Sequence, residues 1–136
     1  MSIQQLSVFI ENKPGRLAAA CAVLADAGVN IHALSLADTE KFGILRLIVA
    51  DWERGQRLLQ DAGYMVKCTA VLAVLLPNTP GSLSQLLEAL RPINIDYLYA
   101  MSDPGRAQSV MFLRVDALEK AETLCRQAGI PLLESF

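Results

Sequence analysis

The sequence predicts an α+β fold made of two consecutive βαββαβ units, and the main evidence is an internal repeat. The segment Asn12-Lys13-Pro14-Gly15-Arg16-Leu17 returns 66 residues later as Asn78-Thr79-Pro80-Gly81-Ser82-Leu83. A fixed period of this length indicates that one structural unit occurs twice. We therefore expect a first unit over residues 1–68 and a second over residues 69–136.

The first strand and helix of the first unit follow from a change in hydrophobic period. Apolar residues recur with strand-like alternation over residues 3–10. Pro14 then suits the first turn of a helix, because proline lacks the N–H that a helix start leaves unpaired. Apolar residues fall on one face of this helix until Gly28 ends it.

A hairpin and a second helix complete the repeating pattern. Residues 29–36 and 43–50 are rich in apolar residues and flank the polar stretch 38–41, which is typical of two antiparallel strands. Asp51 can accept a hydrogen bond from the backbone of the following turn, and Gly63 can end the helix there.

The second unit repeats this plan, and no linker rich in Pro, Gly or Ser separates it from the first. The last strand of the first unit is therefore expected to run directly into the second unit. Asp116 and Glu119 have the spacing of a capping box. The right-handed crossover rule gives each unit a four-stranded antiparallel sheet with both helices on one face. The expected elements of the second unit are strands over 70–76, 93–101, 109–115 and 131–136, and helices over 80–90 and 117–128.

The composition predicts an oligomer. Hydrophobic residues make up 53% of the chain, and units of about 66 residues bury only about 60% of their unfolded surface. Each unit needs further apolar partners, so we expect a homodimer. The formal net charge is −2, and neither half is basic. Nucleic acids and anionic membranes attract clustered positive charge, so we expect neither as a partner.

The cysteines and the apolar runs predict a cytoplasmic protein. Cys21, Cys68 and Cys125 lack a Cys-x-x-Cys spacing, which is typical of reduced thiols. The longest apolar run, residues 70–76, is too short to span a membrane. The N-terminus shows no basic segment followed by an apolar stretch, so we expect no signal peptide.

The repeated loops resemble those of the ACT domains, which are small ferredoxin-like regulatory modules that bind amino acids. The resemblance rests on residues 11–17 together with Gly28-Val29-Asn30-Ile31, which are similar to the serine-sensing domain of D-3-phosphoglycerate dehydrogenase. The second copy has Asn94-Ile95 without the preceding glycine. The resemblance covers nearly the whole chain. It implies a free-standing tandem ACT protein that acts allosterically on a partner such as a regulated enzyme or a transcription factor.

The resemblance also implies which residues bind the ligand. In the serine-sensing domain, the asparagine of the first loop and the asparagine that opens the second strand hold the effector. A histidine there precedes the first asparagine by two positions, whereas this chain has Ile10, which favours a ligand more hydrophobic than serine. The candidate binding residues are Asn12, Lys13, Pro14, Gly15, Arg16, Leu17, Asn30 and Ile31, with Asn78, Thr79, Pro80, Gly81, Ser82, Leu83, Asn94 and Ile95 in the second copy.

The chemistry of the loop agrees with an amino acid ligand. A glycine at a helix start lets a carboxylate approach the unpaired N–H groups, and an asparagine oxygen can accept from an ammonium group. We expect the loop of one unit to face the second strand of a neighbouring unit. We also expect Gly15→Val to weaken ligand binding more than it destabilises the fold.

Other functions have less support in the sequence. No set of Ser, His and acid and no close pair of carboxylates is evident, and His32 is the only histidine, so we expect no enzyme activity, metal or cofactor. A purely structural dimerisation module would not need the asparagine pairs. RNA-binding units share the βαββαβ order but need aromatic residues at stacking positions of the third strand, where this chain has aliphatic ones. An amino-acid-binding regulatory protein is the leading hypothesis.

Overall fold

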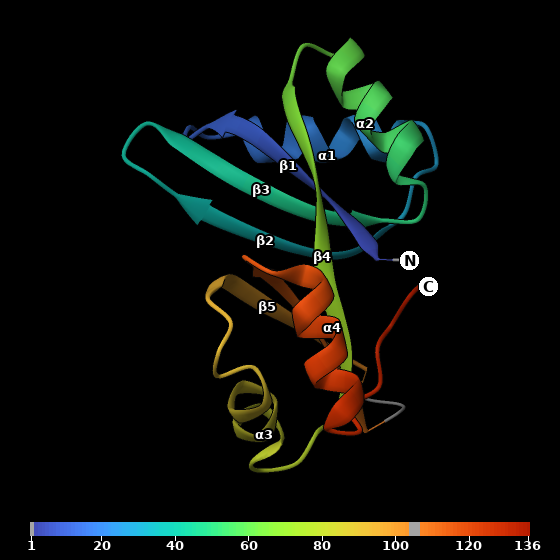
Figure 1. Ribbon diagram of the computed structural model, residues 1–136. Helices are drawn as coiled ribbons and strands as arrows, with labels where there is room; N and C mark the ends of the chain where they lie inside the picture. The colour runs from blue at the N-terminus through green and yellow to red at the C-terminus, as the bar shows by residue number, and fades with distance from the viewer. Residues whose placement is uncertain (1, 104–106) are drawn as a thin grey trace. The chain divides into compact units, whose positions relative to one another are not determined.

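The structure is a computed structural model that describes residues 2–103 and 107–136. The chain folds into two compact units, an N-terminal unit of residues 4–69 and a C-terminal unit of residues 70–136 with the chain start up to Ile3. The elements, labelled in Figure 1, are β1 (Ile3–Glu11), α1 (Arg16–Asp26), β2 (Ile31–Asp38), β3 (Phe42–Val49), α2 (Trp52–Asp61), β4 (Met65–Pro77), α3 (Ser82–Ala89), β5 (Ile95–Asp103), β6 (Gln108–Val115) and α4 (Leu118–Gln127).

The N-terminal unit is an antiparallel sheet covered by two helices. Its strands lie in the order β2-β3-β1-β4, with β3 antiparallel to both β1 and β2. Alternate residues of β1 and β3 point to the same face and form one buried cluster with Leu24 of α1 and Leu59 of α2. Both helices therefore pack on one face of the sheet, as the sequence predicts (Figure 1).

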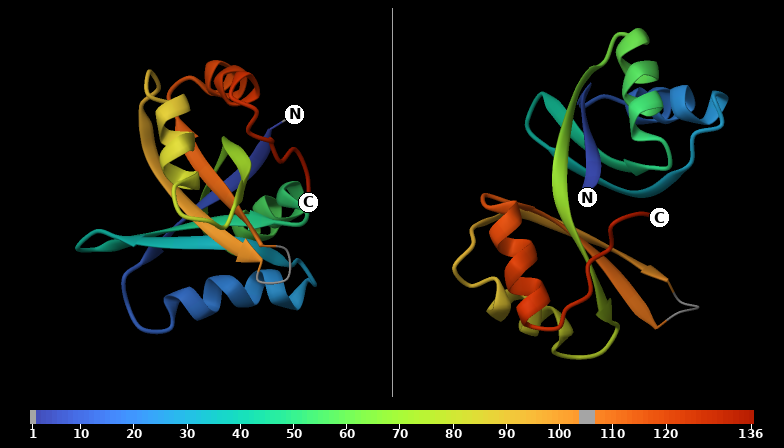
Figure 2. Two further views of the ribbon diagram at one scale, coloured as in Figure 1. Left: turned by 90° about the horizontal axis from the view of Figure 1, so that it is seen from below. Right: turned by 45° about the vertical axis from the view of Figure 1, so that its right-hand side comes forward.

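β4 is one continuous strand of 13 residues that serves both units (Figure 2). Its first part is the last strand of the N-terminal unit, and its second part is the first strand of the C-terminal unit, where the order is β4-β6-β5. The prediction that the last strand of the first unit runs directly into the second is confirmed. The absence of Pro and Gly from residues 65–76 permits this continuous ladder.

The two units bury the same positions of the repeat. The pair Leu6 and Leu47 between β1 and β3 returns 66 residues later as Leu72 and Leu113 between β4 and β6. The duplicated pattern of apolar residues therefore specifies two separate hydrophobic cores. Equivalent buried residues include Val8 and Val74, Ala20 and Leu86, Leu24 and Leu90, Val49 and Val115, and Leu59 and Cys125.

The offset changes from 66 to 64 residues on the second strand of each unit. Ile31 pairs with Val49 in the N-terminal unit, and Ile95 pairs with Val115 in the C-terminal unit. The change accompanies a shorter helix, because α3 has 8 residues and α1 has 11. The register is irregular at the same point of both strands, next to the two pairs named above.

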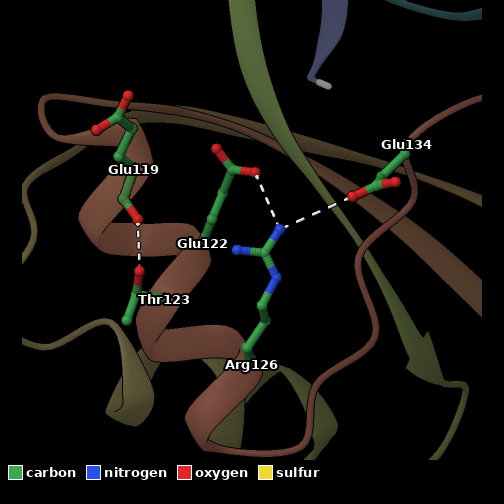
Figure 3. Close-up of polar contacts among 5 residues, drawn as sticks. All are labelled: Glu119, Glu122, Thr123, Arg126 and Glu134. Atoms are coloured by element: carbon green, nitrogen blue, oxygen red, sulfur yellow. Dashed lines mark hydrogen bonds and ion pairs between the residues drawn. The ribbon is translucent and has the colours of Figure 1, made fainter.

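The predicted strand over residues 131–136 is wrong. In the part of the chain that the structure describes, this segment makes only an isolated bridge between Leu132 and Val74. Pro131 has no N–H to donate, so a regular ladder cannot begin there. The segment is also held by Glu134, whose carboxylate lies 3.8 Å from the Arg126 guanidinium of α4 (Figure 3).

Of the two predicted acidic caps, one is confirmed and one is wrong. Asp51 accepts a hydrogen bond at 3.2 Å from the backbone N–H of Arg54 and so caps α2. The N-cap of α4 is instead Ala117, without a side-chain hydrogen bond. Asp116 accepts from the backbone N–H of Asn94 at 3.2 Å, so its carboxylate ties the start of β5 to the end of β6.

None of the helices in residues 2–103 and 107–136 combines the length and the apolar character that crossing a membrane requires.

Equivalent core leucines should contribute similarly to stability. We expect Leu24→Ala and Leu90→Ala each to lower the free energy of unfolding by about 2–5 kcal/mol, because both side chains are fully packed. Urea unfolding followed by circular dichroism measures the change. Leu87→Ala on the exposed side of α3 is the control, and an equal loss there would contradict this account of the core.

Candidate functional site

The loop before α1 leaves backbone donors exposed at the helix start. Gly15 precedes the helix with φ 82°, and no side chain caps it. The N–H of Arg16 donates to the Lys13 carbonyl at 3.3 Å, and the next intrahelical bond runs from Ala19 to Gly15 at 3.0 Å. Within the described residues, the N–H groups of Leu17 and Ala18 have no hydrogen-bond partner. These donors and the positive end of the helix favour an anion.

The loop before α3 has the same backbone. Gly81 has φ 89°, the N–H of Ser82 donates to Thr79 at 3.3 Å, and that of Gln85 donates to Gly81 at 3.0 Å. The hairpin also holds both loops alike, because Lys41 accepts from the N–H of Asn12 at 3.2 Å and Ala107 accepts from that of Asn78 at 2.9 Å. Both copies of the Asn-x-Pro-Gly motif therefore adopt the same backbone conformation at the start of a helix.

A small pocket lies beside the first loop. It has a volume of about 120 Å³ and is lined by Ile10, Asn12, Lys13 and Leu17 of the first loop and its flanks, together with Glu11, Leu36, Asp38 and Gly43. The strand register explains the grouping, since Gly43 of β3 pairs with Ile10 of β1 on one side and with Asp38 of β2 on the other.

Gly43 keeps this pocket open. A Cβ atom at this position would lie 3.2 Å from Cδ1 of Leu36 and 3.3 Å from Cγ1 of Ile10. A glycine inside a strand costs stability but allows another group to approach closely. The space between Ile10 and Leu36 therefore depends on the missing side chain.

Two acidic residues line the pocket, Glu11 and Asp38, and Asp38 is the one available to a ligand. Glu11 is paired with Lys13 at 3.1 Å, and the hydrogen bond from Lys13, then its charge and then that of Arg16, lower the pKa of Glu11. In the described part of the chain, the Asp38 carboxylate makes no hydrogen bond or ion pair. The pocket thus has donors for a carboxylate at the helix start and an acceptor for a cation at the end of β2.

Asn30 lies at the other end of α1, away from this pocket. It lines an open hollow of about 440 Å³ together with Cys21, Gly28 and Ile31. A helix of 11 residues is about 16 Å long, so Asn12 and Asn30 of the same unit cannot contact one amino acid. The structure brings together the predicted residues 12–17 but not the predicted asparagine pair.

The C-terminal unit has the loop without the same pocket residues. Ser102 and Ser109 pair across β5 and β6 as Asp38 and Gly43 do across β2 and β3, and their hydroxyl oxygens lie 3.3 Å apart. This unit therefore has neither the carboxylate nor the glycine gap. The predicted Asn94 also differs from Asn30, because its amide donates to Asp96 at 2.9 Å.

The site residues predicted from the sequence do not include Leu36, Asp38 or Gly43. A glycine within an apolar run was the available signal, because it often marks close approach of another group to a strand. The cross-strand register that joins it to Asp38 and Ile10 becomes evident only in the structure.

The fold and the site together define a class of protein. Two ferredoxin-like units follow one another, and each begins its first helix after a left-handed glycine. A family model described as "ACT domain pair" matches residues 1–132, so this chain belongs to the ACT domain pair family.

Solved structures agree with this family. Protein BT0572 from Bacteroides thetaiotaomicron is 33% identical with a TM-score of 0.92, and the match covers 98% of this chain and 92% of that one. The ligand-free regulatory subunit of aspartate kinase from Thermus thermophilus is 15% identical with a TM-score of 0.69, over 94% of this chain and 93% of that one. The corresponding subunit from Thermus flavus is also 15% identical, with a TM-score of 0.64 over 95% and 94%. At 15% identity, these two show a shared fold. No curated protein matches the chain.

Gly15→Val should destabilise the fold, contrary to the sequence-based expectation that this substitution acts mainly on ligand binding. A Cβ at Gly15 would have open space, but its φ of 82° is strained for a side chain. We expect Gly15→Val and Gly81→Val to cost about 1–3 kcal/mol each in urea unfolding. Gly15→Asn should cost less, because asparagine adopts this conformation more readily. Equal losses for Val and Asn would show that backbone strain is not the cause.

Proposed function

We propose that this protein is a non-catalytic regulatory protein that binds a free amino acid in the pocket beside Asn12. The observation that carries the proposal is that one small pocket has hydrogen-bond donors on one side and a carboxylate on the other. Leu17, which lines the pocket, and Ala18 beside it have backbone N–H groups without a partner among the described residues, and Asp38 offers a carboxylate at the end of β2. A free amino acid has the matching groups, because its carboxylate accepts hydrogen bonds and its ammonium group donates them.

The walls of the pocket favour an apolar side chain of small or medium size. Ile10 and Leu36 face the space that Gly43 leaves, and neither can donate to a hydroxyl group. The volume of about 120 Å³ is small, so the ligand also needs a surface from outside this pocket. Asn12 is exposed at the rim, and its amide oxygen is available for the ammonium group.

We propose that a second copy of the chain supplies the missing surface. On the edge strand β2, Leu34 and Leu36 are 52% and 48% exposed, and an apolar edge strand is a ready site for pairing. Asn30 lies on the same edge but cannot reach the pocket of its own unit. A homodimer would let Asn30 of one copy approach the loop of the other.

The descriptions of two similar structures favour a regulatory role, which we propose is exercised in the cytoplasm. Two of the similar structures are described as regulatory subunits of aspartate kinase. We propose by analogy that ligand binding here controls a partner, either an enzyme or a transcription factor. The C-terminal unit has serines at the positions equivalent to Asp38 and Gly43. It would then have a structural role and contact that partner.

A ligand screen tests the proposal directly. We expect one or more apolar amino acids to raise the melting temperature of ligand-free protein, because a ligand at 100 times its dissociation constant stabilises by about 2.7 kcal/mol. Gly43→Ala should abolish most of this shift, since the new Cβ occupies the gap between Ile10 and Leu36. Ser109→Ala, at the equivalent position of the C-terminal unit, should leave the shift unchanged. If none of the twenty amino acids binds at millimolar concentration, a structural dimerisation module becomes the better reading.

Asp38 should bind the ammonium group rather than support the fold. We expect Asp38→Asn to weaken amino acid binding about tenfold, in line with loss of a charge-assisted hydrogen bond. Calorimetry should show this loss with little change in melting temperature, because Asp38 is exposed. Equal loss of affinity for the corresponding 2-oxo acid, which has no ammonium group, would contradict this role.

A further inference from the structure

A larger pocket adjoins the proposed amino acid pocket in the N-terminal unit and shares Ile10 and Glu11 with it. It has a volume of about 510 Å³ and its walls include Phe9, Glu11, Arg16, Phe42, Tyr64 and Met65. These residues come from the end of β1, the start of α1, the start of β3 and the turn that leads into β4. The proposed amino acid function does not use Phe9, Phe42, Tyr64 or Met65.

The positive charge at this pocket is only partly compensated, because Arg16 acts on Glu11 through its charge but forms no ion pair with it in the described part of the chain. Arg16 is the first residue of α1, where the helix dipole disfavours a cation. Among the described residues, its guanidinium has no acidic partner within ion-pair distance. Glu11 is the nearest candidate, and it is paired with Lys13 at 3.1 Å. The pocket therefore presents a cation that is free to meet an anion.

The apolar side chains that line this pocket are more exposed than a role in the hydrophobic core would require. Phe9, Phe42 and Met65 are 38%, 52% and 72% exposed, although large apolar side chains are usually buried. The equivalent positions of the C-terminal unit are occupied by Leu75, Gln108 and Pro131, and Ser82 stands in place of Arg16. The same fold thus forms without this group of side chains.

We propose that this pocket is a second binding site, for a carboxylate that carries a large apolar body and no ammonium group. Arg16 binds the carboxylate through its planar pair of N–H donors. Phe9, Phe42 and Met65 cover the apolar body, which is aromatic or branched aliphatic. An ammonium group is disfavoured, because the Arg16 charge repels it and because it would have to compete with Lys13 for Glu11, the one carboxylate among the described lining residues.

Titration with three small probes tests the site on the full chain. The probes are 3-phenylpropionate, the uncharged analogue 3-phenylpropanol, and L-phenylalanine, followed by NMR shifts of backbone amides and by calorimetry. We expect 3-phenylpropionate to bind, with shifts around Arg16 and Phe42, and the other two probes to bind about tenfold more weakly. Equal affinity for the alcohol would overturn the role of Arg16, and tighter binding of phenylalanine would overturn the exclusion of an ammonium group.

Matched variants separate this site from the amino acid pocket. Arg16→Gln and Phe42→Gln should each weaken 3-phenylpropionate binding, and the second variant introduces the residue found at the equivalent position 108. Arg57→Gln on the exposed side of α2 and Gly43→Ala should leave it unchanged. Binding that Gly43→Ala abolishes, or that the amino acid from the thermal screen displaces, would place the probe in the first pocket and overturn the proposal. Amino acid binding without any binding of 3-phenylpropionate would overturn this inference alone.

Discussion

The left-handed conformation of the glycine before α1 is the constraint on which the site depends. At φ 82°, Gly15 turns the chain from β1 into the helix within a few residues. The turn uses the Lys13 carbonyl for the first N–H of the helix and leaves the next two donors without partners among the residues that the structure describes. Helix starts are usually completed by a side chain at the cap, and glycine cannot provide one. Water or a ligand must therefore satisfy these donors, and the proposed ligand carboxylate would do so.

The two copies share one backbone fold but differ in the charge of their loops. Their cores match position by position, as with Leu24 and Leu90, because packing tolerates few changes of volume. Their loop surfaces differ in charge, since Lys13 and Arg16 correspond to Thr79 and Ser82. Residues exposed at a loop contribute little to stability, so they are free to diverge once the fold is secure.

Much of the fold follows from local signals in the sequence. Alternating apolar residues and the Asn-x-Pro-Gly turns predict the order of strands and helices, because both act over a few neighbouring residues. Two predictions failed, one because a distant residue decides the outcome and one because a proline within the segment was given too little weight. Asp116 has the spacing of a helix cap, yet its carboxylate accepts a hydrogen bond from the backbone N–H of Asn94. Pro131 interrupts the strand that the repeat predicts over residues 131–136.

The candidate site also combines a local motif with residues that only strand pairing brings together. Its loop, residues 12–17, is a contiguous motif and was found from the sequence. Asp38 and Gly43 are five positions apart in a hairpin, and only the pairing of β3 with β1 brings them to Ile10. A single sequence does not specify which residues face each other across a sheet, so these contributions could not be predicted.

The continuity of β4 has a consequence for how such a protein can evolve and be divided. Most duplicated modules are joined by segments that can be cut or lengthened without harm to either neighbour. Here the boundary between the units, at residues 69 and 70, falls inside a strand of 13 residues. A break there would leave unpaired backbone groups at a new strand end, and an insertion of one residue would reverse the faces of every side chain that follows. We therefore expect that neither half can be exchanged for another module by simple recombination at this boundary.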